Sequence, residues 1–443
     1  MFLLSLSKGV NVDFDLEFLL TAVRRYLCLQ QEGGYFSDET NHPFISSLIQ
    51  QCHISEFVFL VSDEEKEVIN DTKVDFAEVM AGNPDAVRKL CLLALYKPIH
   101  RFMEFDQVAR KLRYHKAIPK DLRGWIGERS KFRRRKMKLL ERIEQLSPIA
   151  DPTSRSVARQ YEENPYPQWS TLTRPKDSSA KNNLKRFFLS REVDFIDRPF
   201  NVLIAGCGTG SQLVRWGLEF GTKADITALD LRKASLAYAA AKADQYGLDA
   251  IRFVHGDILA LDGLYQVFDI VLVTGVIHHM ADPLNGWRIL VDRLRLGGLM
   301  LVSLYSAVVR SLYPRFGQHP DYRAAPAKEH HISKVRRELM AETPPGERRE
   351  KGMTGRDFFY MSGVRDLMFH ASEKRFTIAE IERCLTDLGL EFRGFDNLAN
   401  PVYKEVMASF GDPSKLANWE TYEKTNPRTF DGMYEIWCVK NPG

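Results

Sequence analysis

Five short apolar runs in the second half of the chain have the length and composition of buried strands. They are rich in Val, Ile and Leu, and most end at a glycine or an acidic residue: Val202–Ala205, Asp225–Asp230, Ile251–Asp257, Phe268–Gly275 and Leu294–Tyr305. Runs that are apolar at successive positions are typical of strands covered on both faces of a parallel sheet. The pattern predicts an α/β core in this part of the chain.

The first 150 residues have a different pattern, in which apolar positions recur at helical spacing. Residues 13–27 and 85–96 are the clearest cases, and Asn83-Pro84 supplies a helix start signal before the second. No repeat of fixed period is visible. We therefore expect an irregular, all-α N-terminal domain over residues 1–150.

A glycine-rich loop follows the first predicted strand. Gly206, Gly208 and Gly210 lack a Cβ atom, so the backbone can adopt positive φ and approach a ligand closely. Ser211 then opens a helix whose N-terminus faces that ligand. The spacing is G-x-G-x-G rather than the G-x-G-x-x-G of a dinucleotide fingerprint, so the loop predicts a nucleotide-type ligand without a pyrophosphate.

The next predicted strands also end in residues suited to a nucleoside. Asp230 lies about 20 residues after the loop, the distance at which a carboxylate can accept both ribose hydroxyls, and we predict it to be the ribose ligand. Asp257 closes the third strand and Thr274-Gly275 closes the fourth.

Together these motifs resemble the class I S-adenosylmethionine-dependent methyltransferases. The resemblance implies S-adenosyl-L-methionine as cofactor, an adenine-side role for Asp257 and a cofactor contact at Thr274. It also implies a seven-stranded Rossmann-like sheet, completed by strands at residues 391–395 and 433–439, with the last strand antiparallel. The chain is most similar to a bacterial sub-group with an N-terminal helical, tetratricopeptide-like half, although the signatures of that repeat are absent.

The expected organisation has three parts. The N-terminal helical domain at 1–150 is followed by a linker or lid segment at 151–183 and by a methyltransferase domain at 184–443, with an insertion after strand five at about 306–375. Because the insertion leaves the carboxyl end of a strand, it is placed to shape the acceptor pocket. The Asn164–Trp169 segment is either a proline-rich linker with aromatic anchors or a lid over the cofactor.

Methyl transfer needs mainly an acceptor lone pair held in line with an activated methyl group, and a base only if the acceptor carries a proton. The candidates for such a base lie at strand ends and in the insertion: His278, His279, Tyr305 and His370. The alternative for His278-His279 is that the pair simply starts the next helix. No set of residues has the spacing of a metal site, so no metal is expected.

Charge and composition refine the picture. The window 97–142 holds 16 Lys/Arg against 5 Asp/Glu, which predicts either a surface for an anionic partner or a solvated helix face. The six cysteines are scattered singly, as in reduced cytoplasmic proteins. No stretch predicts a membrane span or a signal peptide, so we expect a cytoplasmic protein without membrane association.

These observations predict a methyltransferase that acts on an N or O nucleophile. A protein acceptor is favoured slightly over a small molecule, and RNA bound through the basic window ranks third. A non-catalytic S-adenosylmethionine-binding adaptor is the remaining alternative. The oligomeric state stays open.

Overall fold

The computed structural model divides the chain into two units, each built from two separate segments. A helical unit comprises Met1–Arg135 and Arg315–Phe369, and a sheet unit comprises Lys136–Pro314 and His370–Gly443. The structure describes residues 1–30, 34–36, 38–99, 109, 111–116, 118–163, 169, 171–172, 180–312, 328–370 and 372–441. The chain therefore passes between the units three times.

The helical unit contains the helices that the N-terminal pattern predicts. Asp13 caps α2 by accepting a hydrogen bond from the Leu16 N–H (2.8 Å), and Asn83 caps α6 through the Asp85 N–H (2.9 Å). The described helices are α1 (Phe2–Lys8), α2 (Phe14–Leu29), α3 (His42–Ile54), α4 (Asp63–Asp71), α5 (Phe76–Ala81), α6 (Pro84–Ala94), α8 (Lys120–Leu140, which extends past the unit boundary), α16 (Glu329–Glu342) and α17 (Met361–Phe369).

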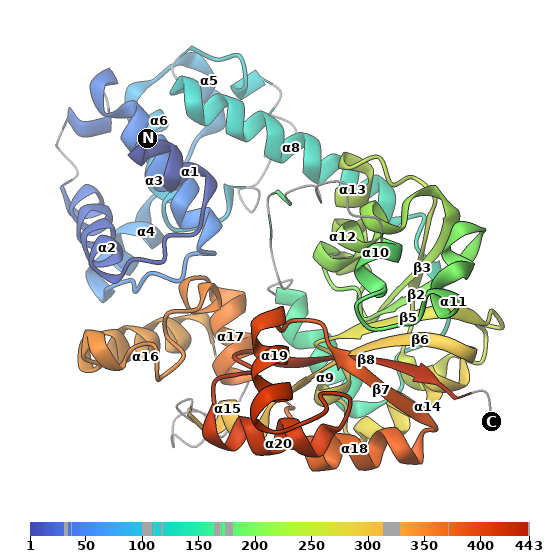
Figure 1. Ribbon diagram of the computed structural model, residues 1–443. Coiled ribbons are helices and arrows are strands. Elements are labelled where there is room, and N and C mark those ends of the chain that lie inside the picture. Colours follow the sequence, from blue (N-terminus) through green and yellow to red (C-terminus); the bar gives the residue numbers. More distant parts are fainter. Residues whose placement is uncertain are drawn as a thin grey trace. The chain divides into compact units, whose positions relative to one another are not determined.

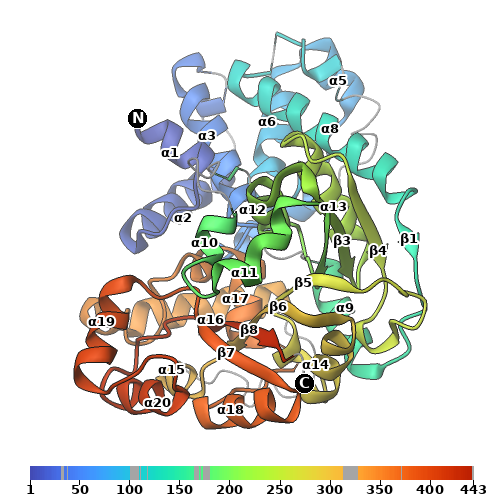
Figure 2. The ribbon, with the colours of Figure 1, turned by 45° about the vertical axis from the view of Figure 1, so that its right-hand side comes forward.

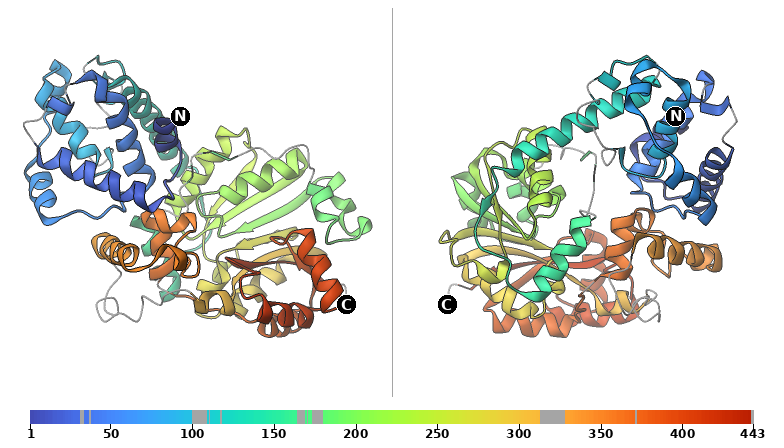
Figure 3. Two further views of the ribbon diagram at one scale, coloured as in Figure 1. Left: turned by 60° about the vertical axis from the view of Figure 1, so that its left-hand side comes forward. Right: turned by 180° about the vertical axis from the view of Figure 1, so that it is seen from behind.

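The inserted helices α16 and α17 pack against the N-terminal helices of this unit (Figure 3). Arg336 on α16 makes two hydrogen bonds to the carboxylate of Glu17 on α2, at 2.5 and 2.6 Å, and both side chains are buried. Phe14 stacks on Phe358 at a centroid distance of 5.9 Å. Ser362 donates to the buried Glu56 carboxylate from its N–H and its hydroxyl.

This division differs from the expected ranges in two ways. Residues 315–369 of the expected insertion pack with the N-terminal helices, and the first boundary falls near residue 135, within α8. The cause of the packing is burial of apolar side chains. Ile332, Met361 and Val364 share one buried cluster with residues of α2, α3 and α6. The helical unit would be left with an uncovered core without them.

The sheet unit confirms the predicted Rossmann-like architecture, with one strand more than expected. The strands are β1 (Glu144–Gln145), β2 (Phe200–Ala205), β3 (Ala224–Asp230), β4 (Ile251–His255), β5 (Phe268–Thr274), β6 (Leu294–Tyr305), β7 (Leu390–Phe395) and β8 (Met433–Lys440). They run in the order β1-β4-β3-β2-β5-β6-β8-β7, and Figure 2 labels all of them except β2. Strands β1 to β6 pair in parallel, and β8 is antiparallel to both β6 and β7.

Helices cover both faces of this sheet (Figure 1). On one face, α12 and α13 pack on Val202, Leu272 and Leu301, and on the other α14 and α18 pack on Leu203, Val271 and Val302. The helices of this unit are α9 (Pro152–Glu163), α10 (Ala180–Leu184), α11 (Ser190–Val193), α12 (Ser211–Phe220), α13 (Lys233–Gln245), α14 (Pro283–Asp292), α15 (Ala307–Leu312), α18 (Ile378–Asp387), α19 (Asn400–Ser409) and α20 (Leu416–Thr425).

Strand order places a switch point between β2 and β5. Connections leave β2 toward β3 on one side and β5 toward β6 on the other, so a crevice opens beyond the carboxyl ends of these two strands. The glycine loop follows β2, and Thr274 ends β5. The topology thus brings the predicted cofactor residues to the position where open α/β sheets bind ligands.

Two further features predicted from the sequence concern the cysteines and membrane spans. Cys28, Cys52, Cys91, Cys207 and Cys438 are buried, and Cys384 is half-buried. Among the described residues, no helix has both the length and the apolar composition needed to cross a bilayer.

The buried ion pair predicts how the helical unit responds to mutation. Glu17→Gln leaves the Arg336 guanidinium buried without its counter-charge, and we expect a loss of about 3–5 kcal/mol in the free energy of unfolding. Urea unfolding followed by circular dichroism measures this loss. Glu64→Gln is the matched control, because its pair with Arg25 is exposed and should contribute little. An equal, small effect of both substitutions would contradict the assignment.

Candidate active site

The glycine loop adopts the left-handed backbone that its sequence predicts. Gly206, Gly208 and Gly210 have φ values of 71°, 52° and 85°, a region that costs side-chain-bearing residues free energy. The N–H groups of Gly206 and Cys207 both donate to the carbonyl of Leu229 on β3, at 2.8 and 3.0 Å. These bonds hold the loop across the ends of β2 and β3.

Two of these glycines are also required by close packing. A Cβ atom on Gly206 would lie 2.2 Å from a methyl group of Val276, and one on Gly210 would lie 2.9 Å from the Cα atom of Ala239 on α13. Real Cβ atoms do not approach so closely, so any side chain would displace the loop or the segments beyond it. The loop is a tight backbone cradle at the start of α12.

Asp230 is hydrogen-bonded to the backbone of the glycine loop. Its carboxylate accepts hydrogen bonds from the Gly208 N–H (2.8 Å) and from the Arg232 N–H (3.0 Å). A carboxylate has about four acceptor sites, so capacity is left for ligand hydroxyls. Burial raises the pKa of Asp230 to about 6, against the opposing effect of the Gly208 hydrogen bond. The side chain thus keeps the acceptor capacity that the predicted ribose contact requires.

The other predicted cofactor residues lie at neighbouring strand ends. Asp257 is buried after β4, where its side chain accepts the Leu259 N–H (3.0 Å) and caps a short 3-10 helix, Ile258–Ala260. The hydroxyl of Thr274 at the end of β5 is buried and has no hydrogen-bond partner within the described part of the chain. An unsatisfied buried hydroxyl costs free energy, which suits a group that serves a ligand.

The segment before the core is anchored to the glycine loop at its C-terminal end. The buried Trp169 donates its indole N–H to the carbonyl of Thr209 within the loop (3.1 Å). Tyr238 and Lys242 on α13 hold Trp169 in turn, through a hydrogen bond of 2.7 Å to its carbonyl and a cation–π contact of 4.9 Å. Residues 164–168 lie outside the described residues, so the lid expectation for Tyr166 stays a prediction.

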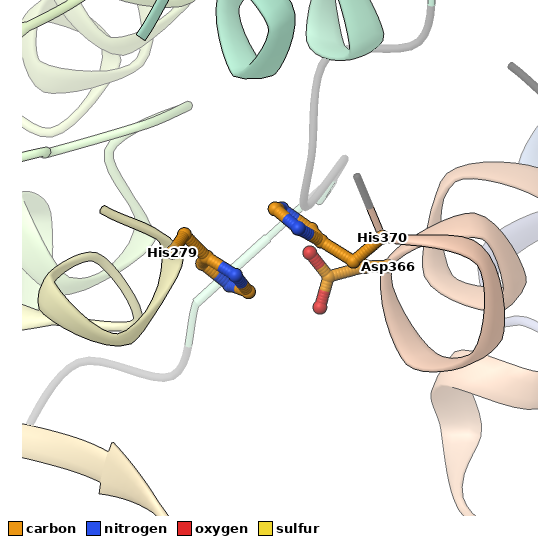
Figure 4. A group of neighbouring side chains, drawn as sticks. All are labelled: His279, Asp366 and His370. Carbon is orange, nitrogen blue, oxygen red and sulfur yellow. The ribbon is translucent and has the colours of Figure 1, made fainter. Parts of the chain in front are cut away.

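The four predicted catalytic residues come together in the sheet unit. His278 and His279 lie in a 3-10 helix, Ile277–His279, after β5, and Tyr305 ends β6. The ring of His278 lies 4.1 Å from that of Tyr305 and 4.2 Å from that of His279. His370 stacks on His279 at a centroid distance of 3.5 Å, as Figure 4 shows. We name these four residues the histidine–tyrosine cluster.

Burial keeps the central imidazoles of this cluster neutral. Burial lowers the pKa of His279 to about 4, although a hydrogen bond to the Ser372 carbonyl (2.7 Å) and the charge of Glu373 oppose the shift. Because a carbonyl only accepts, the Nδ1 atom of His279 carries the proton and its Nε2 atom keeps a lone pair. The pKa of His278 is also well below its usual range, through burial and then the neighbouring His279 and His370.

Sequence reasoning missed the charged residues that support this cluster. The buried Arg310 on α15 forms an ion pair with Glu373, which also pairs with Arg375 at 2.7 Å. The Arg310 guanidinium lies 4.5 Å from the ring centre of Tyr305. In the sequence, Arg310 and Glu373 stand more than 60 residues apart in charge-rich stretches, and neither position carries a local signal.

With this geometry established, the similarity to known proteins can be stated. The methyltransferase domain family matches residues 202–298, which include the glycine loop, Asp230, Asp257 and both histidines after β5. Residues 202–298 form a methyltransferase domain. This class I domain is of the type that uses S-adenosyl-L-methionine, as the sequence predicted.

The curated relatives match only part of this chain. The chain is 26% identical over 223 residues to an uncharacterized protein of Synechococcus sp., covering 47% of this chain and 51% of that protein. It is 34% identical over 113 residues to the ubiquinone biosynthesis O-methyltransferase of Ruegeria pomeroyi, covering 24% of this chain and 43% of the relative. The chain spans about half the length of the curated relatives it matches.

Similar solved structures share the fold only in part. One is PKMT2 from Rickettsia typhi in complex with AdoHcy, with 14% identity, a TM-score of 0.41 and coverage of 67% of this chain and 54% of that one. Another is the plantazolicin methyltransferase BpumL in complex with SAH, with 16% identity, a TM-score of 0.34 and coverage of 71% and 98%.

The residues of this site fit the cofactor. The cradle admits no side chain at Gly206 or Gly210, Asp230 keeps free acceptor sites, and the Thr274 hydroxyl is unsatisfied. When bound, S-adenosylmethionine supplies an electrophilic methyl group on a sulfonium. Asp230 at the end of β3 and Asp257 after β4 would hold its nucleoside.

The neutral state of His279 has a consequence for pH stability. In the unfolded chain this histidine takes up a proton near pH 6.5, whereas in the folded protein it does so only near pH 4. The free energy of unfolding is therefore unaffected by this residue above pH 6.5 and decreases as the pH falls from 6.5 toward 4. The loss attributable to this residue is about 3 kcal/mol. Urea unfolding measured between pH 7.5 and 4 should show it.

His279→Asn can keep the donor to the Ser372 carbonyl and should remove this part of the pH dependence. The control is His331→Asn, at an exposed histidine on α16, which should leave the profile as in the wild type. If the His279→Asn profile matches that of the wild type, the residue does not titrate as described.

Proposed function

We propose that this protein transfers a methyl group from S-adenosylmethionine to an N or O nucleophile. The observation that carries the proposal is the arrangement of two groups on adjacent strands. Asp230 and the glycine loop adjoin the end of β2, and the histidine–tyrosine cluster adjoins the ends of β5 and β6. A nucleoside bound at the first group would have its reactive end directed toward the second.

The histidine–tyrosine cluster would position the acceptor and accept its proton, and its buried imidazoles are uncharged. His279 presents the unprotonated Nε2 of a neutral ring, and the ring of Tyr305 closes over His278. His370 covers the outer face of His279. Such a site suits an acceptor that gives up one proton as it is methylated, since a neutral imidazole is available to receive it.

A protein acceptor remains our first choice. The helical unit joins residues 1–135 with 315–369, which is far more than a lid over a diffusible metabolite needs, and surfaces of that size more often dock macromolecules. The basic residues of α8 favour an acidic partner, since opposite charges speed encounter. These features support the choice and leave RNA as the weaker candidate.

A small-molecule acceptor is the second candidate, and the relatives favour it. Two of them are named ubiquinone biosynthesis O-methyltransferases, from Ruegeria pomeroyi and another Ruegeria strain, so by name they methylate an oxygen atom in the biosynthesis of ubiquinone. The matched segments cover 24% and 31% of this chain. Most of this chain therefore lies outside the similarity that suggests such an acceptor.

Cofactor binding provides the first test of the proposal. Asp230→Asn removes the charged acceptor for the ribose hydroxyls but keeps an amide oxygen for a backbone N–H. We expect the Kd for S-adenosylhomocysteine to rise about 10- to 150-fold in isothermal titration. Because the pKa of Asp230 is about 6, wild-type binding should also weaken as the pH falls through that value.

Asp225→Asn is the matched control for this test. It makes the same charge change on the same strand, but Asp225 is exposed at the opposite end of β3. Its Kd should equal that of the wild type. Unchanged affinity in Asp230→Asn, with the fold intact, would refute the cofactor assignment.

The nature of the acceptor is tested by the fate of the methyl group. Full-length protein incubated with radiolabelled S-adenosylmethionine and a lysate of the source organism should place label in protease-sensitive, non-dialysable material. The His279→Asn variant should lose most of that incorporation while keeping its affinity for S-adenosylhomocysteine. Label that passes freely through a dialysis membrane would instead establish a small-molecule acceptor.

A further inference from the structure

Three polar side chains form a row across the sheet beside the predicted cofactor site. The strand register pairs Thr274 on β5 with Ser303 on β6, and Ser303 with Glu435 on β8. Directly paired residues project from the same face of a sheet, with Cβ atoms about 4.5–5.5 Å apart. We name these three residues the polar row.

The polar row lies on the face of the sheet that carries α12. The residues two positions away on the same strands, Leu272, Leu301 and Trp437, all belong to the apolar cluster under α12. The row therefore interrupts an otherwise apolar face close to the carboxyl ends of β5 and β6. Tyr305 of the histidine–tyrosine cluster comes two residues after Ser303 on the same face.

Two of the three side chains in the row are buried and unsatisfied in the structure. The hydroxyls of Ser303 and Thr274 are buried and have no hydrogen-bond partner among the described residues, and Ser303 is fully buried. No described residue makes a hydrogen bond or ion pair with the Glu435 carboxylate. The two buried hydroxyls without partners cost the fold free energy, and a ligand that satisfies them would recover it, while the half-buried Glu435 adds a carboxylate beside them.

The charge around the row is negative. Burial raises the pKa of Glu435 to about 6, and the nearby carboxylate of Asp396 adds to the shift. Arg215 on α12 opposes the shift, but its guanidinium also pairs with Glu219 at 3.3 Å. Asp396 accepts the indole N–H of Trp437 at 2.9 Å and is thereby fixed beside β8. A cation bound at Glu435 would relieve this repulsion.

We propose that the polar row is a binding subsite for a protonated amino group of the methyl acceptor. Glu435 forms the ion pair with the ammonium group, and the hydroxyls of Ser303 and Thr274 accept its remaining hydrogen bonds, which leaves the O–H donor of Thr274 for the predicted cofactor contact. This inference rests on the proposed function, because the acceptor is the substrate of the proposed methyl transfer. Its geometry stands on the sheet register and the unsatisfied hydroxyls alone.

An ammonium group fits this row better than the alternative ligands. An anion would meet two carboxylates, from Glu435 and Asp396. A divalent metal ion would need more anionic or imidazole ligands than this row offers, because its other members are neutral hydroxyls. An ammonium group has three donors, which matches one carboxylate and two hydroxyl oxygens.

The test uses the full-length protein saturated with S-adenosylhomocysteine and three probes of equal size: benzylamine, benzyl alcohol and benzoate. We expect benzylamine to bind at least about 10-fold more tightly than the other two, as measured by saturation-transfer NMR or isothermal titration. Glu435→Gln should weaken benzylamine about 10-fold or more, since it removes a charged partner. The Kd for S-adenosylhomocysteine should not change.

Two further variants separate recognition from structure. Ser303→Ala should weaken benzylamine binding while keeping or raising the melting temperature, because it removes a buried hydroxyl that has no partner. A purely structural role would lower the melting temperature instead. Glu391→Gln makes the same charge change as Glu435→Gln at an exposed position on β7 and should leave benzylamine binding as in the wild type.

Three results would overturn the subsite. They are equal benzylamine affinity in Glu435→Gln and wild type, tighter binding of benzoate than of benzylamine, and displacement of benzylamine by millimolar MgCl2 or CaCl2, which would indicate a metal site. Failure of S-adenosylhomocysteine to bind would instead count against the proposed function. The benzylamine titration without it would still test the polar row.

Discussion

The buried ion pair between Glu17 and Arg336 joins residues that are 319 positions apart, and the organisation of the whole chain follows from it. Both charges of a buried ion pair must be present, because either one alone would strongly destabilise the folded protein. The segment that carries Arg336 therefore has to return to the N-terminal helices after the chain has built most of its sheet. Segments of the helical unit and of the sheet unit therefore alternate along the sequence.

The two ends of that returning segment are fastened in the sheet unit, beside the candidate active site. The backbone of Phe376 bonds to Tyr305 and Ala307 at 2.9 and 2.8 Å, and Arg310 pairs with Glu373. These contacts bring His370 next to the residues that follow β5. The histidine–tyrosine cluster is thus closed by the same chain connection that leads into the helical unit, so changes in this connection would act on the site through His370 and Tyr305.

The sequence predicted those parts of the molecule that depend on local pattern. The apolar strands, the left-handed glycines and the start of α6 at Asn83-Pro84 are set by residues close in sequence, and the structure confirms them. The four cluster residues were predicted from strand ends and, for His370, from the insertion, and they do lie together, although their roles stay predictions. The packing of 328–369 could not be foreseen, since Arg336 lies in a charge-rich stretch that is typical of a solvated helix. The polar row was equally invisible, because Ser303 and Glu435 become neighbours only through the antiparallel pairing of β6 and β8.

The discontinuous helical unit has a consequence for how the protein is made. A ribosome finishes residues 1–135 about 180 residues before it begins the segment that completes their core, a delay of roughly 10–35 s at common elongation rates. During that interval the surfaces meant for Ile332, Met361 and Val364 are uncovered while the sheet is still emerging. The chain therefore cannot complete its helical unit until residues 315–369 have been translated.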